Sequence, residues 1–272
     1  FIHREAAPVG PPLVEWAVAK ILHKKIIYDF DDAIWTTDRS GESLLVRIVK
    51  FRRKVSMICS WAHTVSCGND FLCQYAGKFN TGVRLNPSTI DHHYHQPGDR
   101  PETQTIAIGW TGSHSTIKYL MPLVPVINRL LDEFKFLHFI AIADRLPQIG
   151  IRNLQFIEWR KETEIQDLSR LDIGIMPLTE DEWSQGKCGF KILQYMAMGI
   201  PSVASPVGVN RAIVRSGVNG YLSGSEDEWY QRLKELILNP SLRIAMGESG
   251  RTLVIRSYSV ESNAANFLSL FE

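Results

Sequence analysis

The stretch GKCGFKILQ, residues 186–194, combines residue types that bind anionic ligands. Lys187 lies just before a run of apolar residues with helical spacing, and Lys191 lies within it. The free N–H groups at the start of a helix attract phosphate. Gly186 and Gly189 let the backbone approach a ligand without a Cβ clash. The pattern predicts a phosphate site at this helix start, although an ordinary strand–helix unit with solvated lysines has the same spacing.

The helix that carries these residues is expected to run over residues 189–198 and to stop at Gly199, before Pro201. Lys191 and Gln194 are three residues apart and therefore share one face of it. An ammonium group suits a diphosphate, and a side-chain amide suits the hydroxyls of a ribose. We expect Lys187 and Lys191 to contact a diphosphate and Gln194 to hold a ribose.

Two further loops with glycines follow apolar runs and are predicted to lie at the same edge of a sheet. One loop lies within IAIGWTGSHST (106–116), and the other is SPVGVN (205–210). The first is not the GxGxxG fingerprint of dinucleotide-binding proteins. The residues predicted to contact the nucleotide sugar in these loops and at the helix start are Gly109, Gly112, Ser113, Gly189, Val207 and Gly208. Simple packing turns would have the same composition.

Other candidates are carboxylates and a tryptophan. Asp31 and Asp32 follow the apolar run KIIYDF, where a carboxylate can orient a hydroxyl of a ligand, although a turn or helix-capping role is the favoured interpretation. Trp159 follows another apolar run and can stack on a base or a sugar, although packing in the core is the alternative.

Three closely spaced histidines, His92, His93 and His95, have no carboxylate cluster near them in the sequence. Metal sites combine imidazoles with further ligands of suitable spacing. The sequence therefore predicts no metal site.

The elements that must position these residues form an alternating pattern of strands and helices. Short apolar runs are separated by helical stretches, which indicates parallel sheets covered on both faces. Ligands of such sheets lie beyond the carboxyl ends of the strands. We expect a doubly wound domain over 105–258, part of a similar domain over 1–85, a Pro- and His-rich linker over 86–104, and a helix over 259–272 that crosses back to the first domain.

Composition limits the class of protein. The chain has 272 residues, 44% of them hydrophobic and 22% charged, and its net charge of +1 gives no reason to expect nucleic acid. Four cysteines without CxxC spacing are read as reduced thiols. Neither a signal peptide nor an apolar run of membrane-spanning length is visible, so a cytoplasmic location is expected. VRIVKFRRK (46–54) mixes basic and apolar residues and can rest on an anionic membrane or form a solvated helix face.

The sequence resembles the retaining glycosyltransferases of family 4, the "group 1" glycosyltransferases with the GT-B fold. The resemblance rests on HREAAPVGPPLVEW, YDFDDAIW and VSCGNDFL in the first half and on NPSTID at the hinge. It continues in IGWTGSHSTIKYL and DIGIMPL and is most specific in GKCGFKILQYMAMGIPSVASPVGVN.

The resemblance implies an α/β protein with two Rossmann-like domains facing a cleft, of which the N-terminal one is incomplete. It also implies a UDP- or GDP-sugar donor bound mainly by the second domain, a glycan or lipid-linked acceptor, retention at the anomeric carbon and no obligatory metal. Two departures stand out. Where the family has two glutamates eight residues apart, this sequence has Gly186 and Gln194.

These observations predict a hexosyltransferase that acts in polysaccharide or glycoconjugate biosynthesis, in the cytoplasm or at the inner face of a membrane. Two alternatives stay open. One is a non-catalytic scaffold that binds nucleotide sugars, and the other is an epimerase or hydrolase of the same architecture.

Overall fold

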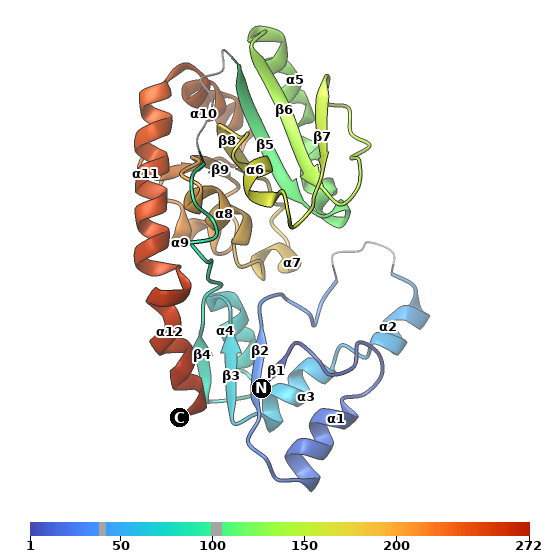
Figure 1. Ribbon diagram of the computed structural model, residues 1–272. Helices are drawn as coiled ribbons and strands as arrows, with labels where there is room; N and C mark the ends of the chain where they lie inside the picture. Colours follow the sequence, from blue (N-terminus) through green and yellow to red (C-terminus); the bar gives the residue numbers. More distant parts are fainter. Residues whose placement is uncertain (38–41, 99–104) are drawn as a thin grey trace. The chain divides into compact units, whose positions relative to one another are not determined.

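A computed structural model describes residues 1–37, 42–98 and 105–272. The chain forms two compact units, each built on one parallel sheet (Figure 1). Unit 1 comprises Phe1–Ser88, Glu180–Cys188 and Asn263–Glu272. Unit 2 comprises Thr89–Thr179 and Gly189–Ser262.

The sheet of unit 2 has six parallel strands in the order β10-β9-β8-β5-β6-β7. Its strands are β5 (Ile106–Gly112), β6 (Leu137–Ala143), β7 (Leu154–Glu158), β8 (Ile173–Met176), β9 (Ser202–Ala204) and β10 (Gly220–Leu222). The chain runs outward from β5 to one edge and then returns to β8 on the other side. This is the doubly wound order, and its switch point lies between the carboxyl ends of β5 and β8.

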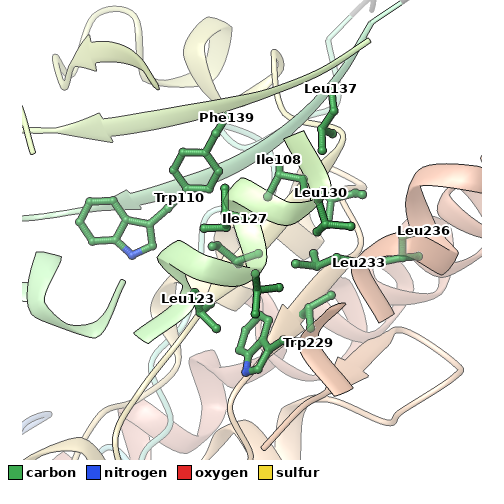
Figure 2. Packing of buried hydrophobic residues seen from close by; sticks show 14 of the residues in the cluster. Ile108, Trp110, Leu123, Ile127, Leu130, Leu137, Phe139, Trp229, Leu233 and Leu236 are labelled. Carbon is green, nitrogen blue, oxygen red and sulfur yellow. The ribbon is translucent and has the colours of Figure 1, made fainter. Parts of the chain in front are cut away.

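Helices cover both faces of this sheet. The helices of unit 2 are the 3-10 turns η2 (His114–Tyr119) and η3 (Met121–Leu123), α5 (Val124–Glu133), α6 (Glu164–Leu168), α8 (Phe190–Ala197), α9 (Asn210–Ile213), α10 (Glu226–Leu238) and α11 (Pro240–Ser257). Figure 2 shows Ile108 and Trp110 of β5 packed with Leu130 of α5 and Leu233 of α10. Tyr195 of α8 belongs to the cluster on the opposite face.

Close packing against the sheet, by α8 at one position and by Leu171 at the other, explains two glycines in its strands. Gly109 of β5 pairs in register with Gly174 of β8. A Cβ at Gly174 would lie 2.5 Å from the ring of Tyr195, and a Cβ at Gly109 would lie 2.2 Å from Leu171. Because neither position has room for a side chain, glycine is required there for packing.

Unit 1 has a smaller parallel sheet of four strands in the order β1-β2-β3-β4. The strands are β1 (Ile2–His3), β2 (Ile27–Phe30), β3 (Thr64–Cys67) and β4 (Val83–Leu85). Its helical segments are α1 (Leu13–Trp16), the π-helix η1 (Ala17–Ile21), α2 (Leu44–Lys50), α3 (Lys54–Trp61), α4 (Asp70–Ala76) and α7 (Glu182–Gln185). Tyr28, Ile58 and Leu72 are fully buried in its core. α12 (Val260–Leu268), followed by a 3-10 turn over Ser269–Phe271, begins in unit 2 and continues into unit 1.

Local structure follows the sequence prediction in most places and differs in one helix. Asn69 caps α4, because its side chain accepts a hydrogen bond from the N–H of Leu72. The stretch 46–54, read from the sequence as one helix face, is divided between α2 and α3 at Phe51, which has a φ of 45°. A residue in the left-handed region ends a helix, and the chain starts α3 in a new direction.

The limits of the compact units differ from the predicted domains at two places. Residues 180–188, which lie within the predicted second domain, pack with unit 1. The part of the predicted linker over 89–98 packs with unit 2, where Ile90 is buried and forms a bridge with Ser259. Residues 99–104 of that linker lie outside the described residues.

Candidate functional site

The carboxyl ends of β5, β8 and β9 in unit 2 carry most of the residues predicted to bind a nucleotide sugar. Side chains tie these strand ends together. Tyr195 accepts a hydrogen bond from Thr111 N at 3.0 Å and donates one to Ile175 O at 3.3 Å, so it bridges β5 and β8. Burial raises the pKa of Tyr195, which keeps its donating proton in place. Ser205 accepts from Leu178 N at 2.9 Å and links the loops after β9 and β8.

The start of α8 has the geometry expected of an anion site. Gly189 is the N-cap and has a φ of 74°, a conformation that side-chain-bearing residues rarely adopt. A Cβ there would lie 2.5 Å from Ile213 Cδ1, so glycine is required for space as well. Lys191 lies in the first turn and is partly exposed. The first N–H groups of a helix have no partner within it, and the ammonium adds charge beside them.

Gln194 is held by a carboxylate that the sequence analysis did not single out. Its Nε2 donates to Oε1 of Glu164 at 3.0 Å, and both side chains are buried. A carboxylate without a proton only accepts hydrogen bonds, so the NH₂ group of Gln194 must face it. Among the residues that the structure describes, the Gln194 carbonyl oxygen makes no hydrogen bond. The amide therefore keeps an acceptor for a hydroxyl.

Glu164 is the centre of a larger network. Its Oε1 also accepts from Nε1 of Trp159 at 3.3 Å, and its Oε2 accepts from the hydroxyl of Tyr94 and from Nζ of Lys161, both at 3.2 Å. Trp159, predicted to stack on a base or sugar, thus has its indole N–H engaged while its side chain is 44% exposed. An exposed ring face next to a fixed N–H is suited to stacking on a planar or sugar ligand.

Gly109, predicted to contact the ligand from the loop after β5, does not lie in that loop. Gly109 is buried in the middle of β5 against Leu171 and does not reach the loop, because the strand extends to Gly112. A Cβ at Gly112 would meet the ring of Trp110 at 2.4 Å, which accounts for that glycine by packing. Ser113 follows the strand, and its Oγ lies 2.9 Å from Oγ of Ser115 at the surface.

The loop after β9 presents fewer N–H groups than the sequence suggested. The N–H of Val207 donates to Ser205 O at 2.8 Å and is therefore already used. Gly208, with a φ of 52°, lies before α9, and its N–H donates to no backbone carbonyl within the described ranges. Gly208 is thus a better candidate than Val207 for a backbone hydrogen bond to the ligand.

The remaining predicted residues gather in unit 1. Lys187 Nζ lies 2.8 Å from Oδ1 of Asp32, and Arg4 also forms an ion pair with Asp32. Asp31 is different: in the described part of the chain its Oδ1 accepts no hydrogen bond, and it lies 3.7 Å from Nε of Arg4. Nε2 of His3 lies 4.0 Å from the same oxygen. The structure thus brings Asp31, Asp32 and Lys187 together, and Asp31 is the more exposed of the two carboxylates, at 48% of its side chain against 20% for Asp32.

Residues 180–188 are attached to unit 1 by several contacts. The Asn69 side chain donates to Lys187 O at 3.1 Å, and Cys188 donates to Asp31 O at 3.0 Å. A Cβ at Gly186 would lie 2.6 Å from Cβ of Ala33. The position at which the resemblance expects a glutamate therefore has no room for a side chain in this structure. Burial also raises the pKa of the Cys188 thiol to about 12, which makes it unreactive at neutral pH.

Comparisons with known proteins agree with this architecture. Residues 105–239 match the family model described as Glycosyl transferases group 1. The matched segment contains β5 to β10, α8 and the loops described above for unit 2. No curated protein matches the sequence at a significant level.

Solved structures extend the likeness to both units. Sucrose-phosphate synthase from Thermosynechococcus elongatus has a TM-score of 0.74 at 14% identity, covering 95% of this chain and 71% of that one. HepE from Anabaena, solved with UDP and glucose, has a TM-score of 0.72 at 15% identity, covering 94% and 74%. The C-terminal domain of LpcC, a glycosyl transferase group 1 family protein from Francisella tularensis, has a TM-score of 0.53 at 19% identity, covering 63% and 99%. The chain has the GT-B fold.

Proposed function

We propose that the protein is a glycosyltransferase that moves a hexosyl group from a UDP- or GDP-sugar to an acceptor hydroxyl, with retention at the anomeric carbon as in family 4. The observation that carries the proposal is the match of residues 105–239 to the group 1 family, because this segment contains the α8 start and the strand-end loops. HepE, of the same fold, was solved with UDP-glucose, which supports a nucleotide-sugar donor here.

Unit 2 supplies the donor-binding groups in this proposal. The N–H groups at the α8 start and the Lys191 ammonium bind the diphosphate. The carbonyl oxygen of the Gln194 side chain accepts a hydrogen bond from a ribose hydroxyl, and the ring of Trp159 stacks on the base or the sugar. Breaking the sugar–phosphate bond builds negative charge on the leaving diphosphate. Fixed dipoles and an ammonium stabilise that charge without a metal ion.

In this proposal, unit 1 supplies the residues that bind and orient the acceptor. We assign the orientation of the acceptor hydroxyl to Asp31, because Asp32 is engaged by Arg4 and Lys187. We assign the leaving-group role to Lys191 because it lies in the first turn of α8, beside the N–H groups that begin the helix. Lys187 lies in unit 1, where its ion pair with Asp32 competes with any phosphate contact.

One observation favours a second candidate, a non-catalytic protein that binds nucleotide sugars. Gly186 and Gln194 replace both glutamates of the family motif, and the Gly186 site has no space for a carboxylate in this structure. The lack of glutamates at these two positions also argues against an epimerase or hydrolase that would use them as acid and base.

Binding of UDP and of uridine to Lys191→Ala tests the donor site. A hydrogen bond to a charged group contributes about 1.5–3 kcal/mol, so we expect UDP to bind roughly tenfold to a hundredfold more weakly while uridine binding changes little. Lys135→Ala is the matched control, because Lys135 lies on the loop before β6, at the amino end of the strands. Isothermal titration calorimetry gives both affinities. Equal losses for UDP and uridine would remove Lys191 from the phosphate site.

Nucleotide release separates the two candidate functions. UDP-sugars and GDP-sugars are incubated with the protein, with and without a glycan acceptor, and the free nucleotide is measured. A transferase releases nucleotide faster when the acceptor is present. Tight binding without release under any condition would favour the scaffold.

The acceptor is proposed to reach the protein at a membrane surface, in polysaccharide or glycoconjugate assembly at the inner face of the membrane. Two segments of unit 1, one around α1 and one around α2, expose apolar side chains and are together called the α1–α2 surface here. A backbone hydrogen bond of 2.7 Å from Gly10 N to Val49 O joins the two segments. The exposed apolar side chains of this surface are Val9, Leu13, Val14, Trp16, Ile21, Leu22, Leu45, Val46, Ile48 and Val49. The exposed cations Lys20, Lys24, Lys25 and Arg53 lie within or next to these segments.

Apolar side chains with cations among them fit an anionic bilayer surface. Two basic residues of the predicted amphipathic stretch 46–54 do not contribute. Lys54 is buried and donates to Ala7 O at 2.7 Å, and Arg52 pairs with Glu42, a hydrogen bond that raises the pKa of Arg52. The surface lies against the bilayer rather than through it in this proposal. Within the described ranges, no helix combines the length and the apolar character that crossing a membrane requires.

A further inference from the structure

Two histidines and a glutamate from opposite ends of unit 2 meet at the surface. His92 and His93 lie in a turn near the start of the unit, and Glu261 lies in the first turn of α12. Nδ1 of His92 is 3.2 Å from one carboxylate oxygen of Glu261, and Nε2 of His93 is 3.3 Å from the other. One ligand atom from each of the three residues can be chosen so that all lie within 4.8 Å of one another.

The two nitrogen–oxygen distances to Glu261 are those of neighbouring ligands on one metal ion, and the separation of the two imidazole nitrogens is within 4.8 Å. Zinc binds imidazole nitrogen and carboxylate oxygen at about 2.0–2.2 Å in tetrahedral sites, which places adjacent ligand atoms about 3.3 Å apart. Two imidazoles and one carboxylate are a common zinc donor set, and the fourth position is then open to water.

The nitrogen of His92 supplies a second, independent observation. Nδ1 of His92 is buried and has no hydrogen-bond partner among the described residues, although the Glu261 carboxylate is close to it. Buried polar atoms are nearly always satisfied, and an unsatisfied one indicates a missing ion or water. A metal ion between the two groups would satisfy the nitrogen and the carboxylate together.

Backbone contacts hold the three residues in place before any ion binds. Asp91 Oδ1 accepts hydrogen bonds from His93 N at 2.9 Å and Tyr94 N at 3.0 Å, which fixes the turn. Ile90 N donates to Tyr258 O at 2.9 Å, and Val260 N donates to Ile90 O at 3.2 Å. Because the turn and the start of α12 are joined in this way, little further ordering is needed for binding.

We propose that His92, His93 and Glu261 form a binding site for a divalent transition metal, with Zn²⁺ as the best-suited ion. The site is separate from the α8 start and does not depend on the proposed transferase activity. The chain first enters unit 2 after Ser88 and leaves it for the last time after Ser262. A bound ion would therefore fasten together the two segments that lead into and out of unit 2.

Titration of the chelator-treated full chain with ZnCl₂ tests the site. Calorimetry should give one Zn²⁺ per chain, and thermal unfolding should shift upward with zinc because only the folded chain brings the three ligands together. His93→Ala and Glu261→Gln each remove one exposed ligand, and each should weaken binding at least tenfold and abolish the thermal shift. Co²⁺ in place of Zn²⁺ should give the strong visible absorption of a four-coordinate site in the wild type alone.

His114→Ala is the matched control. His114 also lies near a carboxylate, with Nδ1 3.9 Å from Asp144, but that pair has no second imidazole in the described residues. This variant should bind Zn²⁺ like the wild type. Thermal unfolding without zinc shows whether each variant is folded. Absence of stoichiometric binding by the wild type, or equal affinity in all variants, would overturn the proposal.

Discussion

The carboxylate of Glu164 shows how one residue can compensate for a substitution at another. The family motif has a glutamate where this chain has Gln194, and a neutral amide interacts with hydroxyls more weakly than a carboxylate does. Glu164 fixes the amide with its NH₂ group inward, so that the carbonyl oxygen stays available. In the proposed function Glu164 is a positioning residue that acts through Gln194.

Glu164→Gln should weaken the binding of uridine and UDP by a similar factor, because it disturbs the ribose contact and leaves the diphosphate contact in place. Four donors converge on this carboxylate, and the new NH₂ group would face some of them, at a cost of about 1–3 kcal/mol per unsatisfied group. We therefore also expect a lower unfolding temperature. Calorimetry with both ligands, compared with the exposed control Glu162→Gln, measures the effect. Unchanged uridine affinity would show that Glu164 is structural only.

At the scale of elements, the contact between α11 and α8 places the start of α8. Gly247 of α11 lies against the backbone that ends α8, and a Cβ there would lie 2.1 Å from Gly199 O. Gly250, one turn further along, lies against the side chain of Met196, and a Cβ there would be 2.9 Å from Met196 Cγ. The close approach fixes the C-terminal end of α8 and, through the rigid helix, the direction of its first turn.

Gly247→Ala should destabilise the protein even though alanine favours helices by about 0.5–1 kcal/mol over glycine. The clash is with backbone, which cannot move aside without shifting a helix, and overpacking of this kind costs about 1–3 kcal/mol. Urea unfolding gives the change, and the exposed neighbour Glu248→Ala should stay within about 0.5 kcal/mol of the wild type. A stabilised Gly247→Ala variant would contradict the close packing of α11 on α8.

At the scale of the whole molecule, the α1–α2 surface predicts binding to anionic vesicles. The full chain should sediment with vesicles that contain phosphatidylglycerol, more strongly at low salt, and weakly with phosphatidylcholine alone. Leu45→Glu combined with Ile48→Glu places two charges on the apolar part and should reduce binding at least tenfold.

Ile244→Glu is the control for this experiment, because Ile244 is an exposed apolar residue on α11 of unit 2, outside the α1–α2 surface. It should leave vesicle binding unchanged. If the wild type stays in the supernatant with anionic vesicles, or if both variants bind equally well, the acceptor does not reach the protein through this surface.

The sequence by itself determined the α/β architecture, most strands and the α8 start, because these depend on local patterns. Continuous apolar runs mark buried parallel strands, and the glycines before FKILQ mark a tight entry into a helix. The stretch 46–54 shows the limit of such patterns: the left-handed conformation of Phe51 divides it, and Lys54 turns inward.

Only the tertiary structure decided which distant residues meet. It buried Gly109 in β5, joined Glu164 to Gln194, paired Lys187 with Asp32 and brought Glu261 to His92 and His93. The physical reason is that a local pattern fixes the direction of a side chain relative to its own helix or strand. Which partner it meets depends on how the elements pack, and packing is decided by the shape and burial of the whole core.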